Sequence, residues 1–129
     1  MSNVPTDRMY ARSHEWAHEQ ADGTVAIGIS DHAQEALGDL VFVEVPEVGR
    51  TLQQGEACAV VESVKAASDV YAPVAGTVVA VNQALAQAPE LVNKDPYGDG
   101  WILRLKPSAA LAAADLLSAE AYAKLAEAG

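Results

Sequence analysis

The sequence predicts a mainly β domain, in which short antiparallel strands are joined by tight turns and small helices lie at the edges. Two segments, TVAIGI (24–29) and WILRLKP (101–107), place large apolar residues at every second position, as half-buried strands do. Glycine, proline and Asp-Gly turn signals separate the apolar runs at short intervals. With 129 residues, 50% of them hydrophobic, the chain can form one domain around one core.

The N-terminal part is predicted to form a hairpin, a short helix and a strand. The turn signal Asp22-Gly23 joins the segment 14–20 to the alternating segment 24–29, which indicates a β-hairpin. The segment DHAQEAL (31–37) follows a serine that can cap a helix and precedes a glycine that can end one. LVFVEV (40–45) then reads as a strand, stopped by a proline.

The middle and the C-terminal part are predicted to be short strands followed by a helix. Pro46-x-x-Gly49 recurs as Pro73-x-x-Gly76, each just after a strand, which indicates two related β-halves. An alanine-rich tail with serine caps predicts the final helix. The predicted strands are 57–64, 68–74, 77–82 and 101–107, and the helical segment is 108–129.

Charge and cysteine content narrow the possible functions. The net charge of −10 argues against a nucleic-acid partner, because phosphates require a basic surface. Cys58 is the only cysteine, so no internal disulfide can form, and its apolar surroundings predict a buried thiol rather than a nucleophile. The start of the chain has no signal-peptide pattern, and no apolar run reaches membrane-spanning length. We therefore expect a soluble, cytoplasmic protein with no membrane partner.

One short motif suggests a metal site. HEWAH (14–18) matches the H-E-x-x-H pattern, in which two helical histidines hold zinc and a glutamate acts as general base. On a strand, however, residues four apart lie roughly 13 Å from each other, too far to share one ion. Because the Asp-Gly turn predicts a strand here, we expect no metal site, and a zinc hydrolase is a rival hypothesis only if the stretch is helical.

A second stretch, VVESVKAASDVYAPV (60–74), places Lys65 between two predicted strands. The lysine is therefore expected on an exposed hairpin tip, where its amine could be modified. Most exposed lysines are simply solvated charges, so composition and spacing carry this idea no further.

The chain resembles the H proteins of the glycine cleavage system. The matching segments are SHEW (13–16), VAIGISDHAQEALGD (25–39), VFVEVPEVG (41–49), ESVKAASDVYAPVAG (62–76) and NKDPYGDGWILRLKP (93–107). The resemblance implies a barrel-sandwich hybrid of antiparallel sheets, of the type of lipoyl and biotinyl carriers, with short peripheral helices and a C-terminal helix. It implies one lipoyl-carrier domain over residues 1–129, with a core at about 8–107 and the helical segment after it.

The resemblance also implies a function. In this family a lysine, here Lys65, carries lipoic acid in amide linkage, and the protein is a carrier rather than an enzyme. The implied partners are the glycine decarboxylase that loads an aminomethyl group, the aminomethyltransferase that removes it, the dihydrolipoyl dehydrogenase that reoxidises the arm, and the lipoylating enzymes. We expect a bacterial monomer.

Six further site residues follow from the resemblance. Glu62 matches a carboxylate that guides the lipoylating enzyme, and Gly49 and Gly76 match glycines with the same role, although both glycines also suit turns. Ser13, Glu15 and Asp69 match residues of a cleft that holds the loaded arm, where a carboxylate could bind its ammonium group.

Related carriers remain as alternatives. A lipoyl domain of a 2-oxo acid dehydrogenase or a biotin carrier would have the same kind of lysine, but such domains lack the SHEW segment. Biotin domains also favour methionine beside the lysine, where this chain has Val64 and Ala66. A relative that relays lipoate to other complexes is a further alternative.

Overall fold

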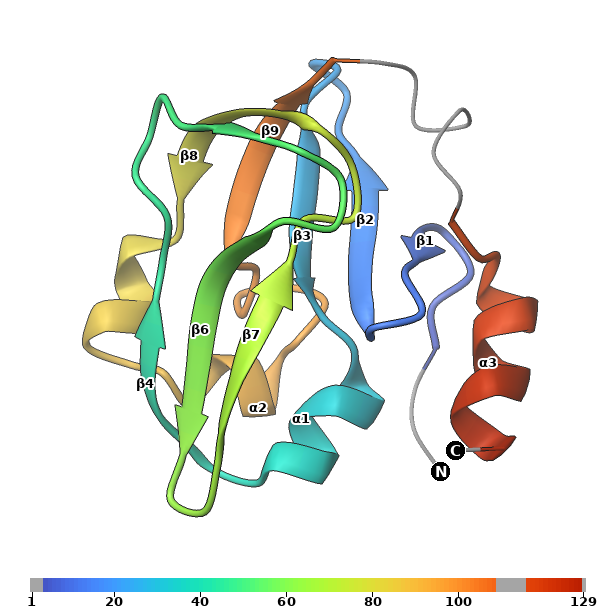
Figure 1. Cartoon of the computed structure of the whole chain (residues 1–129). Helices are drawn as coiled ribbons and strands as arrows, with labels where there is room; N and C mark the ends of the chain where they lie inside the picture. Colours follow the sequence, from blue (N-terminus) through green and yellow to red (C-terminus); the bar gives the residue numbers. More distant parts are fainter. Residues whose placement is uncertain (1–3, 109–115, 129) are drawn as a thin grey trace.

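The computed structural model describes residues 4–108 and 116–128, and it contains two antiparallel sheets (Figure 1). The first has six strands in the order β1-β2-β3-β9-β8-β5, and the second has three in the order β4-β6-β7. Among the described residues, no helix is long and apolar enough to cross a membrane. The strands are β1 (Met9–Tyr10), β2 (Glu15–Glu19), β3 (Val25–Ile29), β4 (Leu40–Glu44), β5 (Thr51–Leu52), β6 (Ala57–Ser63), β7 (Ala67–Tyr71), β8 (Gly76–Val81) and β9 (Leu103–Pro107). The helices are α1 (Asp31–Leu37), the 3₁₀ helix η1 (Gln83–Ala86), α2 (Leu91–Lys94) and α3 (Ala119–Ala128).

The predicted N-terminal hairpin is present. β2 and β3 pair in antiparallel register from Glu15 opposite Ile29 to Glu19 opposite Val25. The expectation that β3 is half-buried is wrong, because all five of its residues are buried. Its second face is covered by an aromatic cluster, and a side chain added at Gly28 would meet the indole ring of Trp16 at 2.7 Å.

The larger core lies between the two sheets. Large side chains are excluded from water there because each sheet presents one apolar face to the other, as sandwich packing requires. Its buried members include Val25, Ile27, Leu103 and Leu105 of the six-stranded sheet and Val43, Val61 and Val70 of the three-stranded sheet.

The predicted short helix α1 connects the two sheets. The hydroxyl of Ser30 caps its start by accepting from the amide of Ala33 at 3.1 Å. Gly38 ends it with a φ of 85°, a backbone conformation that a residue with a Cβ rarely adopts. The capped helix therefore delivers the chain directly into β4.

The C-terminal helix packs against the N-terminal strand. The rings of Tyr10 in β1 and Tyr122 in α3 stack at 4.6 Å, and the backbones of Tyr10 and Leu117 pair. Ser118 accepts from the amide of Ala121 at 3.2 Å, as a capping residue does. The helical segment predicted from residue 108 is too long: residues 108 and 116–118 are not helical, because Leu117 pairs with the backbone of Tyr10, and α3 begins at Ala119. Residues 109–115 of the predicted segment lie outside the described part of the chain.

Candidate functional site

Lys65 lies at the exposed tip of the hairpin that joins β6 and β7. β6 ends at Ser63, whose amide donates to the carbonyl of Ala66 at 2.7 Å and closes the turn. The Ser63 hydroxyl also accepts from the amides of Lys65 (3.3 Å) and Ala66 (3.1 Å). Because Ser63 is buried and holds both ends of the turn, the root of Lys65 is fixed while its amine faces solvent.

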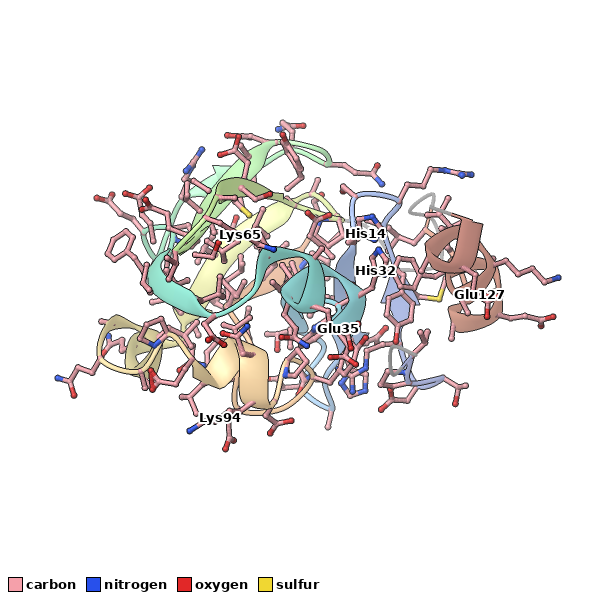
Figure 2. The ribbon with its side chains drawn as sticks, turned by 90° about the horizontal axis from the view of Figure 1, so that it is seen from below. His14, His32, Glu35, Lys65, Lys94 and Glu127 are labelled. Carbon is pink, nitrogen blue, oxygen red and sulfur yellow. The ribbon has the colours of Figure 1, made fainter. Side chains whose placement is uncertain are left out.

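The Lys65 side chain lies beside the end of α1 (Figure 2). Its Cε would be 3.6 Å from a Cβ placed on Gly38, so the glycine leaves room for the lysine stem. No salt bridge joins this amine to the described carboxylates. Glu62 is half-buried on β6, where it pairs with Phe42 on one side and Ala67 on the other.

Glu15, the first residue of β2, joins the N-terminal hairpin to β7. The Glu15 carboxylate is only 2% exposed and accepts from the Ser13 hydroxyl and, at 3.1 Å, from the amide of Tyr71. Burial raises the pKa of Glu15, while the hydrogen bonds from Ser13 and Tyr71 oppose that rise. Glu15 is therefore a buried, hydrogen-bonded carboxylate rather than a solvated surface group.

Asp69 lies on β7, the strand whose Tyr71 amide donates to this carboxylate. It is exposed on β7, two residues before Tyr71, and same-face residues two apart on a strand are about 7 Å from each other. No salt bridge joins it to another described residue. The structure thus joins Ser13 to Glu15 directly, and it joins Glu15 to the strand that carries Asp69.

Gly49 and Gly76 lie elsewhere. The amide of Gly49 donates to the carbonyl of Val78 in β8 at 2.7 Å, and Gly76 is the first residue of β8 and pairs with Leu52. From β5 the chain enters β6 at the end opposite Lys65, and the seven residues of β6 span roughly 20 Å. The two positions also differ in kind: Gly49 has a φ of 96°, whereas a side chain at Gly76 would meet Pro107 Cα at 3.0 Å.

Residues 15–18 of the HEWAH motif lie on β2, as predicted, whereas His14 precedes the strand, and the two histidines have different neighbours. His14 has a φ of 78°, and its Nδ1 is hydrogen-bonded to the Tyr122 hydroxyl at 2.7 Å. The Nε2 of His18 lies 3.7 Å from an Asp7 carboxylate oxygen. Within residues 4–108 and 116–128, no group of three or more potential metal ligands was found.

Sequence reasoning missed a buried polar network around the hydroxyl of Tyr122. The Tyr122 hydroxyl bonds to Ser30 Oγ at 2.6 Å as well as to His14, and the His14 ring lies 4.9 Å from that of His32 (Figure 2). Burial, with a smaller contribution from His32, lowers the pKa of His14. The positive φ of His14 gives no signal in the sequence, and Tyr122 could be expected only as a packing residue.

Comparison with known proteins identifies the family. The family model described as "Glycine cleavage H-protein" matches residues 8–129. The chain belongs to this family. Membership confirms the predicted function, a carrier component of the glycine cleavage system, and the predicted barrel-sandwich fold.

Relatives of the family cover nearly the whole chain. The glycine cleavage system H protein of Cronobacter sakazakii is 58% identical over 98% of each chain. That of Shewanella loihica is 61% identical over 95% of each. The crystal structure of an H protein from Mycobacterium marinum superposes with a TM-score of 0.86 at 46% identity, covering 94% of this chain and 97% of that one.

Proposed function

We propose that Lys65 carries lipoic acid in amide linkage and that the protein is a non-catalytic shuttle for an aminomethyl group. The observation that supports this most directly is the fixed root of Lys65: a buried serine holds the turn while the lysine itself is exposed. A rigid root with a long flexible arm lets the reactive sulfurs visit several active sites, and the cofactor supplies the chemistry.

The proposed partners are the three enzymes of the system and the lipoylating enzymes. A glycine decarboxylase loads the arm, an aminomethyltransferase unloads it, and a dihydrolipoyl dehydrogenase restores the disulfide. The family favours this system over a 2-oxo acid dehydrogenase or a biotin-dependent carboxylase. A relative that relays lipoate to other complexes is the second candidate.

We further propose that Ser13, Glu15 and Asp69 hold the loaded arm. The ionised carboxylate of Glu15 would bind the ammonium of the aminomethyl group by a charge-assisted hydrogen bond, and its buried position would strengthen that contact. Exposed Asp69 would add a second negative charge beside it. Together these groups would favour the cationic cargo over water.

Glu62 is proposed to guide the lipoylating enzyme, since it lies three residues from Lys65 on an accessible face. For Gly49 and Gly76 we propose a purely backbone role, because both adjoin β8 at the other end of β6. We also propose that residues 1–129 form one carrier domain and that the protein is a monomer. The bacterial relatives support a location in the bacterial cytoplasm, which we propose as well.

Intact mass of the protein from its native host, with peptide mapping around residue 65, tests the attachment. We expect a lipoyl-sized increment on the peptide that contains Lys65 and none in a Lys65→Arg control. A biotin-sized increment, or an unmodified lysine in cells with ample lipoate, would contradict the proposal. Reconstitution with a glycine decarboxylase separates the shuttle from the lipoate relay, which would not be loaded.

A further inference from the structure

The outer face of the β4–β6–β7 sheet carries exposed apolar side chains next to Lys65. Val41 is 57% exposed, Phe42 47% and Val64 82%. Single exposed apolar residues are ordinary on protein surfaces. A group of them beside a functional lysine is not, because clustered exposed apolar residues mark interaction sites. We call Val41, Phe42 and Val64 the hairpin-tip patch.

The strand register makes this patch continuous. Phe42 is paired directly with Glu62, and Leu40 with Ser63, so the start of β4 lies against the end of β6. Val64 follows Ser63, and cross-strand neighbours are only about 5 Å apart. The patch therefore adjoins the root of Lys65 on the β4 side of the hairpin.

A break in the strand pairing exposes two of these residues together. The register of β4 against β6 shifts between Leu40 and Phe42, the signature of a β-bulge. Regular alternation would bury one of Val41 and Phe42, whereas both are exposed here. β4 is also an edge strand, so its outer side has no pairing strand among the described residues.

Carboxylates border the patch. Glu44 and Asp69 lie opposite Val60 from the two sides, and Glu62 lies opposite Phe42, which places all three on the outer face. No salt bridge involves any of them within the described part of the chain. With a net charge of −10, this face suits a partner with an apolar socket and a basic rim.

We propose that the hairpin-tip patch is the docking surface for the acyl-transfer enzyme that attaches lipoic acid to Lys65. In that reaction the Lys65 amine attacks the carbonyl carbon of an activated lipoyl group. An amide bond forms, the bond to the activating group breaks, and the amine proton leaves with that group or to solvent. The inference rests on the proposed lipoylation of Lys65.

The position of the patch favours this partner over the enzymes that use the arm. Acyl transfer brings the enzyme's reacting carbon within bonding distance of the lysine nitrogen, so the turn and its neighbours must touch that enzyme. The glycine cleavage enzymes act on sulfurs at the far end of the arm and need not touch its root. Side chains adjacent to the root therefore match the modifying enzyme.

The test compares two sets of threonine substitutions, because threonine is polar at its hydroxyl and yet suits exposed strand positions. The patch variant is Val41→Thr/Phe42→Thr/Val64→Thr, and the control is Val48→Thr/Val79→Thr, two valines that are also exposed but lie outside the patch. Both are assayed with a bacterial lipoate–protein ligase, lipoate and ATP, at varied carrier concentration. We expect KM for the patch variant to rise about tenfold with kcat nearly unchanged, and the control to match the wild type.

The outcomes separate the two proposals. Equal KM values for the patch variant and the control would overturn the docking surface. Variants that are lipoylated to completion and then reacted with a glycine decarboxylase should behave as wild type; an equal tenfold loss there would also overturn this assignment of the partner. A wild-type chain that the ligase leaves unmodified at Lys65 would overturn the attachment itself, and the docking surface with it.

Discussion

The hydroxyl of Tyr122 offers a test of how the C-terminal helix α3 supports the loop of residues 13–15, which carries two of the residues proposed to hold the loaded arm. Tyr122→Phe keeps the ring, and with it the stack on Tyr10 at 4.6 Å, but removes hydrogen bonds to His14 (2.7 Å) and Ser30 (2.6 Å). Ser30 keeps its bond from the amide of Ala33, whereas His14 Nδ1 loses the partner that the structure gives it. With about 1 kcal/mol per lost bond and more for a group left unpaired, the expected loss is about 2 kcal/mol.

Equilibrium urea unfolding measures this loss from the midpoint at constant slope. Tyr10→Phe is the matched control, because its hydroxyl donates to the carbonyl of Pro5 at 2.6 Å rather than bonding to His14 or Ser30, so about 1 kcal/mol is expected. The Tyr122 variant should also release a bound aminomethyl group faster, since His14 lies between Ser13 and Glu15. A Tyr122→Phe protein as stable as the wild type would refute the claim that this network holds the loop.

Further predictions concern a buried acid, two glycines and the thiol. Burial raises the pKa of Glu15 above its ordinary 4.5, so the folded state holds a proton that the unfolded chain releases. The contribution of Glu15 to stability therefore declines as pH rises from about 4.5 through the raised pKa. Glu15→Gln should remove that decline in pH-dependent urea unfolding, and it should also speed aminomethyl release. An identical pH dependence in both proteins would contradict this. Gly76→Ala should destabilise the protein by about 1–3 kcal/mol through collision with the β9 backbone, and Gly49→Ala by about 1–2 kcal/mol through its positive φ, as thermal unfolding can show. Neither glycine variant should slow lipoylation while folded, and a slowed rate would restore their direct role. Burial raises the pKa of Cys58 to about 12, so iodoacetamide should label it only in denaturant, and rapid labelling of the folded protein would show an accessible thiol.

Local patterns were sufficient for most of the secondary structure. The Asp-Gly turn, the serine cap and the terminating glycine correctly place the first hairpin and α1, because such signals act over a few residues. The exposed position of Lys65 also follows locally, since short strands flank it. The same reasoning failed for β3, because its second face is covered by aromatic residues from distant segments.

The residues around the site show what pattern reading cannot reach. Glu15 looks like a solvated strand carboxylate until the Tyr71 amide, 56 positions away, is found to bond it. His14 adopts its positive φ where Tyr122 and Ser30 hold the loop, which only long-range packing can arrange. The β4 bulge that exposes Val41 and Phe42 likewise depends on pairing with β6.

By itself, the sequence determined the antiparallel β class, the hairpin tip at Lys65 and, through its extended resemblance, the family. These properties rest on turns, caps and alternation that neighbouring residues specify. The tertiary structure alone decided which groups meet: it buried Glu15 against β7, separated Gly49 and Gly76 from the lysine, and gathered an apolar patch at its root. The physical reason is that burial and hydrogen-bond partners depend on contacts between segments far apart in the chain, which no local pattern encodes.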